Sequence, residues 1–92
     1  MLEARKYGCL GDAYAEQNQM DKAIENYKKA AEKADNELTA PTYLFRAALA
    51  LAQKGKNDDA LKLFKQVNDN YPATQEGAAA EMYIAKMEAK PL

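Results

Sequence analysis

The sequence contains no histidine and no tryptophan, and its single cysteine is Cys9. Histidine is the commonest general base and a frequent metal ligand, so its absence leaves acid–base and metal chemistry without their usual side chain. A lone cysteine excludes a disulfide within the chain and a metal site built on paired cysteines. Because no imidazole is present to activate its thiol, Cys9 is expected to be a small buried hydrophobic residue rather than a nucleophile.

Other constellations that carry out chemistry are also missing. Asp58 and Asp59 are adjacent in the chain, so on a helix their carboxylates point in different directions and do not form a catalytic pair. Gly8 and Gly11 follow no predicted strand and precede no third glycine or Gly-Lys pair, which excludes a phosphate-binding loop. We therefore expect no enzyme activity, no catalytic residue, no metal site and no cofactor.

Charge and hydropathy exclude two further classes of partner. The 13 basic and 14 acidic residues give a net charge of -1, and acidic side chains are interleaved with the lysines, so no basic surface for nucleic acid is predicted. No apolar run approaches the ~20 residues of a membrane helix. The first six residues lack the apolar centre of a signal peptide. We expect no nucleic-acid partner and no direct membrane contact, and the localisation stays open.

The chain is rich in alanine, the best helix former, and its apolar residues recur with helical spacing. Asn18 and Gly55 are suited to the left-handed conformation that closes helices. Pro41 suits the first turn of a helix, and Thr74 and Asn57 are candidate N-terminal caps. These signals predict no strand and five helices, at about 2–17, 20–34, 40–54, 57–70 and 74–89.

Two sets of small, aliphatic and aromatic residues share the same internal spacing. The first set, whose members should pack a helical hairpin, consists of Tyr7, Leu10, Gly11, Tyr14, Ala23, Tyr27 and Ala30. The second set lies 37 residues further on and consists of Leu44, Ala47, Ala48, Leu51, Ala60, Phe64 and Val67, followed by Pro72. Small residues allow two helices to approach closely, so we expect Gly11 to face the second helix near Ala23.

This spacing resembles the tetratricopeptide repeat, with Tyr7 in place of the usual tryptophan and Pro72 at the place of the terminal proline. The resemblance implies an all-α fold of antiparallel helical hairpins stacked as a right-handed superhelix. On this interpretation residues 1–92 form a single domain, with repeat 1 at about 4–37, repeat 2 at about 41–74 and a terminal capping helix at about 74–89. The usual period is about 34, so roughly three extra residues are expected in the connection at 35–42.

Two repeats are fewer than arrays of this kind usually need for stability, so we expect a C-terminal piece of a longer protein. In bacteria, C-terminal repeat pairs that resemble this one occur in envelope proteins with an N-terminal membrane helix. The resemblance therefore leaves a periplasmic location as one alternative.

The resemblance also implies a non-catalytic scaffold that binds a protein or peptide, a second copy included, on the concave face lined by the first helix of each hairpin. The residues expected on that face are Arg5, Gly8, Asp12 and Ala15 from the first helix, and Thr42, Phe45, Leu49 and Ala52 from the third. Arg46 and Asp12 should lie at its rim. The competing hypothesis is a structural or self-associating segment that packs on upstream repeats or on another copy.

Phe45, Leu49 and Ala52 form a second apolar stripe, separate from the Leu44, Ala48 and Leu51 stripe that the hairpin buries. Two interpretations stay open. In the first, Phe45 anchors an apolar side chain of a partner segment, while Arg46 and Asp12 at the rim set its orientation and charge preference. In the second, the fifth helix or an upstream repeat covers the stripe as core. Some tetratricopeptide domains hold a chaperone carboxylate in a basic clamp. The corresponding places here are Gly8, Asp12, Arg46, Glu76 and Ala80. Only Arg46 is basic, so that function is not predicted.

Overall fold

The computed structural model describes residues 2–34 and 39–89, and within these ranges the chain forms five α-helices and no strand. The helices are α1 (Leu2–Glu16), α2 (Met20–Lys33), α3 (Ala40–Gln53), α4 (Asn57–Asn70) and α5 (Gln75–Glu88). The all-α prediction is confirmed, and each helix ends within one residue of its expected position. Residues 35–38, half of the 35–42 connection where the extra residues were expected, lie outside the described residues.

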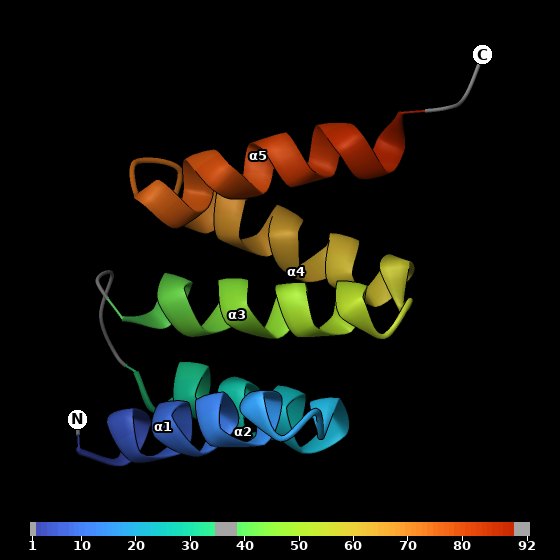
Figure 1. Ribbon diagram of the computed structural model, residues 1–92. Coiled ribbons are helices and arrows are strands. Elements are labelled where there is room, and N and C mark those ends of the chain that lie inside the picture. Colours follow the sequence, from blue (N-terminus) through green and yellow to red (C-terminus); the bar gives the residue numbers. More distant parts are fainter. Residues whose placement is uncertain (1, 35–38, 90–92) are drawn as a thin grey trace.

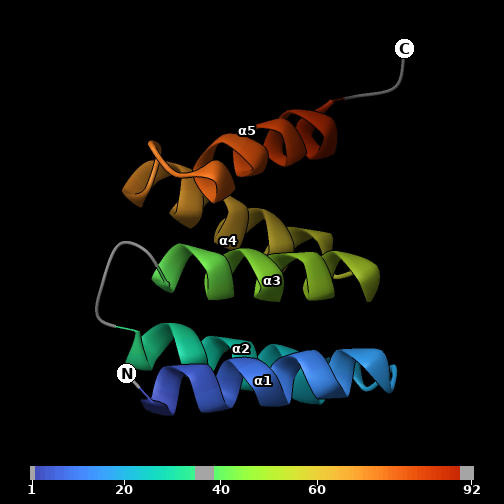
Figure 2. The same cartoon turned by 60° about the vertical axis from the view of Figure 1, so that its left-hand side comes forward.

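The helices stack in chain order (Figures 1 and 2). Each one packs on the next, from α1 against α2 to α4 against α5, and α3 also touches α5. The stack measures 46 × 30 × 15 Å, with α1 and α2 at one end and α5 at the other. The arrangement leaves α1 and α5 as the outermost layers, each with one side that no further helix covers.

The two hairpin turns have the same geometry. Asn18 has a φ of 62° and Gly55 a φ of 81°, both in the left-handed region. In each turn the following amide reaches back to the helix: the Gln19 N–H donates to the Tyr14 carbonyl at 2.8 Å, and the Lys56 N–H to the Leu51 carbonyl at 2.9 Å. These bonds satisfy carbonyls that the helix end leaves without partners. The predicted role of both residues is confirmed.

The predicted start signals are confirmed at two helices and wrong at a third. Pro41 lies in the first turn of α3, and the Thr74 hydroxyl accepts a hydrogen bond from the Gly77 N–H at 2.9 Å. Asn57, however, is already the first residue of α4, and the preceding Lys56 makes no side-chain capping bond. The tight turn at Gly55 brings the chain into the helix one residue earlier than the cap assignment requires.

The main core lies between the second hairpin and α5. All seven members of the second repeated set are buried, and Ala47, Ala48, Ala60, Phe64 and Val67 are fully so. Ala80 brings α5 onto the same core, and Ile84 and Met87 pack at its edge. This hairpin has α2 on one side and α5 on the other, so its apolar residues are enclosed from both directions.

The first hairpin is less enclosed. Gly11, Ala23, Tyr27 and Ala30 are buried, but the expected core residue Leu10 is 38% exposed. Leu10 corresponds to Ala47 in the second repeat, which clusters with Ala23 and Tyr27 of α2. No helix among the described residues covers α1 in the same way, so the prediction that Leu10 packs in the core is wrong.

Three other α1 residues are also incompletely buried, because α1 lies at the end of the stack. Cys9 is exposed, so its predicted burial is also wrong. Tyr7 and Tyr14 are half-buried. The Lys29 ammonium lies 5.7 Å from the centre of the Tyr7 ring, and the Lys22 ammonium 5.5 Å from that of Tyr14. Cation–π contacts thus cover rings on α1 that apolar neighbours do not fully enclose.

Gly11 meets α2 at the Tyr27 ring. A Cβ atom built on Gly11 would lie 2.6 Å from two carbons of that ring, which is too close for two carbon atoms. The second helix is therefore the neighbour, as predicted, but the contact at this point is with Tyr27. Any side chain larger than hydrogen would push the Tyr27 ring out of its place.

We predict that Gly11→Leu lowers the free energy of unfolding by about 1–3 kcal/mol, because overpacking a closed contact forces the helices apart. Ala13→Leu is the matched control, since Ala13 is exposed on the same helix. Urea denaturation monitored by circular dichroism would measure both. A midpoint for Gly11→Leu equal to that of the control would contradict the contact.

Candidate partner-binding face

Helices α1, α3 and α5 share one face of the stack, nearer the viewer in Figure 1 than α2 and α4. Side-chain contacts link them along this surface, which we call the α1/α3/α5 face. Tyr43 of α3 lies against Gly8 of α1, and the Thr42 hydroxyl donates to the Glu76 carboxylate of α5 at 3.2 Å. These contacts bring side chains of α1, α3 and α5 together on one surface.

The residues predicted for this face differ in exposure. Arg5 is exposed near the start of α1, whereas Asp12, Phe45, Arg46, Leu49 and Ala52 are half-buried, as are Ala15 and Thr42. Gly8 is buried, because the Tyr43 side chain occupies the space where a side chain of Gly8 would stand. Gly8 is thus a packing position between α1 and α3 and offers no surface to a partner, contrary to the prediction.

Asp12 and Arg46, expected at the rim, bind each other. Nη1 of Arg46 lies 3.3 Å from Oδ1 and 3.1 Å from Oδ2 of Asp12, and the Tyr27 hydroxyl donates to Oδ1. The Arg46 guanidinium also lies 5.9 Å from the centre of the Tyr43 ring. These contacts, which we call the Asp12 clasp, connect α1, α2 and α3 through polar side chains.

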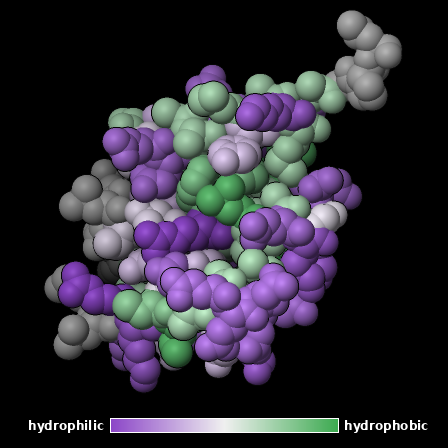
Figure 3. All heavy atoms as spheres, viewed as in Figure 1, coloured by the Kyte–Doolittle hydropathy of each residue, from purple (hydrophilic) through white to green (hydrophobic). Residues whose placement is uncertain are grey.

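Three aromatic rings form a cluster where α3, α4 and α5 meet, on the part of the face farthest from α1. Phe45 meets Phe64 edge-on at 5.6 Å and Tyr83 at 5.7 Å between ring centres. Phe64 and Tyr83 are stacked at 4.9 Å with almost parallel planes. Phe64 is fully buried and Tyr83 is 37% exposed, so the cluster runs from core to surface. Figure 3 shows hydrophobic side chains gathered over this half of the molecule.

A hollow of about 290 Å³ opens beside the Asp12 clasp. Its lining comes from α1, α2 and α3 and is mostly apolar, consisting of Ala15, Met20, Tyr27, Arg46, Leu49, Ala50 and Gln53. Leu49 links the hollow to the aromatic half, since it packs on the same core as Phe45. Because Leu49 lies one helical turn after Phe45 on α3, the hollow lies next to the aromatic cluster.

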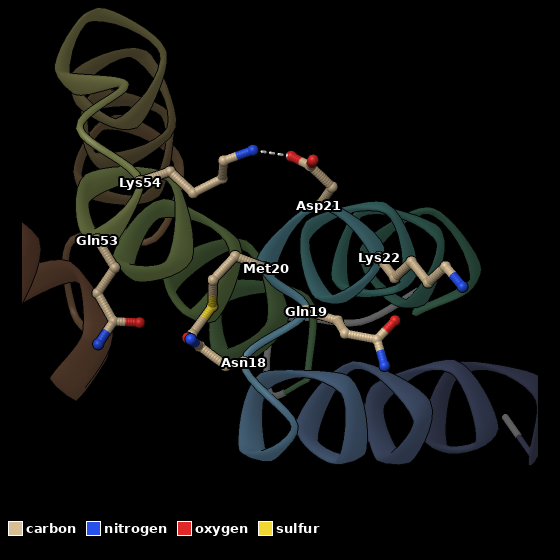
Figure 4. Close-up of a pocket in the computed structure, with 7 residues that line it drawn as sticks. All are labelled: Asn18, Gln19, Met20, Asp21, Lys22, Gln53 and Lys54. Carbon is tan, nitrogen blue, oxygen red and sulfur yellow. Dashed lines mark hydrogen bonds and ion pairs between the residues drawn. The ribbon is translucent and has the colours of Figure 1, made fainter.

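A second hollow, of about 490 Å³, lies between the α1–α2 turn with the start of α2 and the end of α3 (Figure 4). Met20 and Gln53 line both hollows. Lys54 and Asp21 form an ion pair across its outer edge, and hydrogen bonding and attraction to Lys54 lower the pKa of the Asp21 carboxyl. This pair joins the start of α2 to the end of α3. Its carboxylate is exposed, so it contributes little to stability.

Met20, Ala50 and Gln53 were not predicted as site residues. Gln53 follows Leu49 by one helical turn, so the periodicity that selected Leu49 could have found it. Met20 comes from the start of α2 and reaches the hollow only because the Asn18 turn folds α2 back on α1. Its position depends on tertiary packing that no pattern within one helix reports.

Two kinds of feature are not found in the described part of the chain. Among residues 2–34 and 39–89, no group of three or more cysteine, aspartate or glutamate side chains is placed to hold a metal ion. Within the same part of the chain, no helix is both long and apolar enough to cross a membrane. What the face offers is apolar surface, one ion pair and an amide at Gln53.

Stacked antiparallel helix pairs with a repeated set of small and aromatic contacts define a helical repeat protein. The chain belongs to the tetratricopeptide repeat family, whose model matches residues 2–73. Members of this family are generally non-catalytic and generally take part in protein–protein interaction. No curated protein and no solved structure matches the chain.

The Tyr27 hydroxyl has a perturbed acidity. Burial raises the pKa of Tyr27 well above its ordinary value near 10, and the hydrogen bond to Asp12 and the negative charge of that carboxylate add to the effect. In the unfolded chain Tyr27 loses its proton above pH ~10, whereas the folded protein retains it. The unfolded state then binds fewer protons, so stability is present below that pH and falls above it.

We predict that replacing this hydroxyl, in Tyr27→Phe, makes the fall in unfolding free energy between about pH 10 and 11 shallower. Tyr83→Phe is the control, because Tyr83 is partly exposed and lies at the far end of the face. Urea titrations at a series of pH values would measure the slopes. Equal slopes for wild type and Tyr27→Phe would show that the hydroxyl is not retained in its protonated form.

Proposed function

We propose that the chain is a non-catalytic protein-binding module that holds a segment of a partner protein on the α1/α3/α5 face. The observation that carries the proposal is the apolar hollow beside the Asp12 clasp, next to the aromatic cluster. Family membership supports the general role, since tetratricopeptide proteins generally bind proteins or peptides. We also propose that repeat 1 spans about 4–37, repeat 2 about 41–74 and the capping helix about 74–89, as part of a longer protein.

The size of the hollow favours a side chain of a peptide over a small metabolite. Its volume of about 290 Å³ lies at the lower limit of the ~300–1,000 Å³ of small-molecule sites. A peptide would gain further contact along the aromatic cluster. Met20 in the lining is flexible and polarizable, so it would adapt to the shape of the inserted group.

We expect Leu49 to contact the apolar side chain of the partner directly and Phe45 to pack beside it. Two aromatic neighbours hold the Phe45 ring, so it serves partly as core while its half-buried side chain remains part of the surface. Leu49 lines the hollow itself and is also half-buried. The second apolar stripe thus takes part in both of the alternatives that the sequence leaves open.

We expect peptides selected on this protein from a randomised phage-displayed library to depend on Leu49. Leu49→Lys should weaken their binding roughly tenfold or more, because a charge would replace an apolar contact at the centre of the site. Lys62→Glu is the control, since Lys62 is exposed on α4. Fluorescence anisotropy would measure binding, and circular dichroism would confirm folding.

Equal loss of affinity in Leu49→Lys and Lys62→Glu would show that the loss is not specific to the position of Leu49. Unchanged affinity in Leu49→Lys would place the peptides elsewhere on the molecule. A milder variant, Leu49→Ala, guards against misfolding: it should remain helical and bind less tightly than wild type.

A second candidate function, packing on a further repeat or on another copy, is favoured by the outer side of α1. Leu10 and Ala13 are exposed there. Their counterparts on α3, Ala47 and Ala50, are buried, and Ala47 clusters with Ala23 and Tyr27 of α2. A helix resembling α2 would cover α1 in the same manner.

If α1 mediates self-association, the mass measured by sedimentation equilibrium should rise with protein concentration. The double change Leu10→Lys and Ala13→Glu should abolish that rise, because charges would be buried at the contact. Leu49→Lys should leave it intact. A concentration-independent mass for the wild type would rule out self-association of this chain and leave packing on a further repeat as the form of this candidate.

A further inference from the structure

Among the residues that line the hollow, Arg46 carries the charge. Its guanidinium is bound to the Asp12 carboxylate in the Asp12 clasp. The other lining residues are apolar, apart from the Tyr27 ring and the Gln53 amide. Nη1 of Arg46 faces both carboxylate oxygens of Asp12, and the pair is about half exposed, at 42% for Arg46 and 48% for Asp12. The wall of the hollow is therefore close to neutral in net charge.

The Tyr27 hydroxyl is engaged in the same clasp. It donates its proton to Oδ1 of Asp12, so this hydrogen does not point at a ligand in the hollow. Asp12 thus accepts from both polar groups that α2 and α3 bring to this point. The lining polar group outside the clasp is the exposed Gln53 amide, which suits an uncharged hydrogen-bonding group such as a peptide backbone.

Resting on the proposed function, we propose that Asp12 determines the charge specificity of the hollow. By neutralising Arg46 it makes the hollow accept an uncharged apolar side chain of the partner, of leucine or methionine size, and reject a carboxylate. Asp12 is a specificity residue in this assignment, acting through Arg46 and through its own negative charge.

Charge complementarity favours an uncharged side chain in the hollow. A carboxylate entering the hollow would have to displace Asp12 from Arg46 or sit beside it, and like charges at short range repel in a partly buried site. An ammonium group would meet the Arg46 guanidinium. An uncharged apolar side chain displaces water from Ala15, Leu49 and Ala50 and leaves the clasp intact, so apolar burial is gained without breaking an ion pair.

The test uses Asp12→Asn, which keeps an oxygen for the Tyr27 hydroxyl but leaves the Arg46 charge without its counterion. The probes are one peptide selected on the wild type from the randomised library and the same peptide with glutamate beside its apolar anchor. Wild type should bind the glutamate peptide roughly tenfold or more weakly than its parent, and Asp12→Asn should remove most of that discrimination. Asp58→Asn, an equal charge change on the exposed first turn of α4, should discriminate as wild type does.

The outcomes separate this inference from the function on which it rests. Peptides insensitive to Leu49→Lys would show that the proposed face is not the site, and both proposals would fail. Peptides sensitive to Leu49→Lys but discriminating equally in wild type and Asp12→Asn would overturn the role of Asp12 alone. Preferential binding of the glutamate peptide by the wild type would also overturn it. Restored discrimination in the double variant Asp12→Asn, Arg46→Gln would confirm that Asp12 acts through Arg46.

Discussion

An aromatic ring in the middle of the second helix of each hairpin holds three successive helices together. Tyr27 of α2 packs against Gly11 of α1 and clusters with Ala47 of α3. Phe64 of α4 contacts Phe45 of α3 and stacks on Tyr83 of α5. Each ring needs small or flat neighbours, so the spacing of the helices and the choice of residues around them follow from these two positions.

The two rings differ by one hydroxyl group, and this difference divides the α1/α3/α5 face into two halves. A buried hydroxyl requires an acceptor, which Asp12 supplies, and Asp12 in turn brings Arg46 to the α1–α3 contact. Phe64 has no hydroxyl that needs an acceptor, and its ring packs against Phe45 and Tyr83. On this face the Asp12 clasp therefore lies between the two repeats, whereas the aromatic cluster lies where α3 and α4 meet α5.

Position in the stack decides how well each copy of the repeated set is buried. The second set departs further from the repeat pattern, with Leu44 for an aromatic residue and Ala48 for glycine, yet all seven of its members are buried. The first set matches the pattern more closely but leaves Leu10 exposed and two tyrosines half-buried under lysines. Burial depends on having a helix on both sides, and within residues 2–34 and 39–89 the first hairpin has one on a single side only.

The sequence by itself determined the five helices, their turns and the repeated set, because these depend on neighbours in the chain. Asn18 and Gly55 adopt a positive φ that few residues tolerate, and the periodicity of alanines and aromatic residues selects the helical faces. Of the site, Asp12 and Arg46 were chosen from the resemblance to the repeat family, and helical periodicity on α3 added Leu49. Only the tertiary structure decided that Arg46 meets Asp12 across 34 residues, that Gly8 is buried under Tyr43, and that Met20 joins the hollow. Those contacts depend on the translation and rotation of each helix relative to its neighbour. Side-chain packing between helices determines both, and the local sequence of one helix does not.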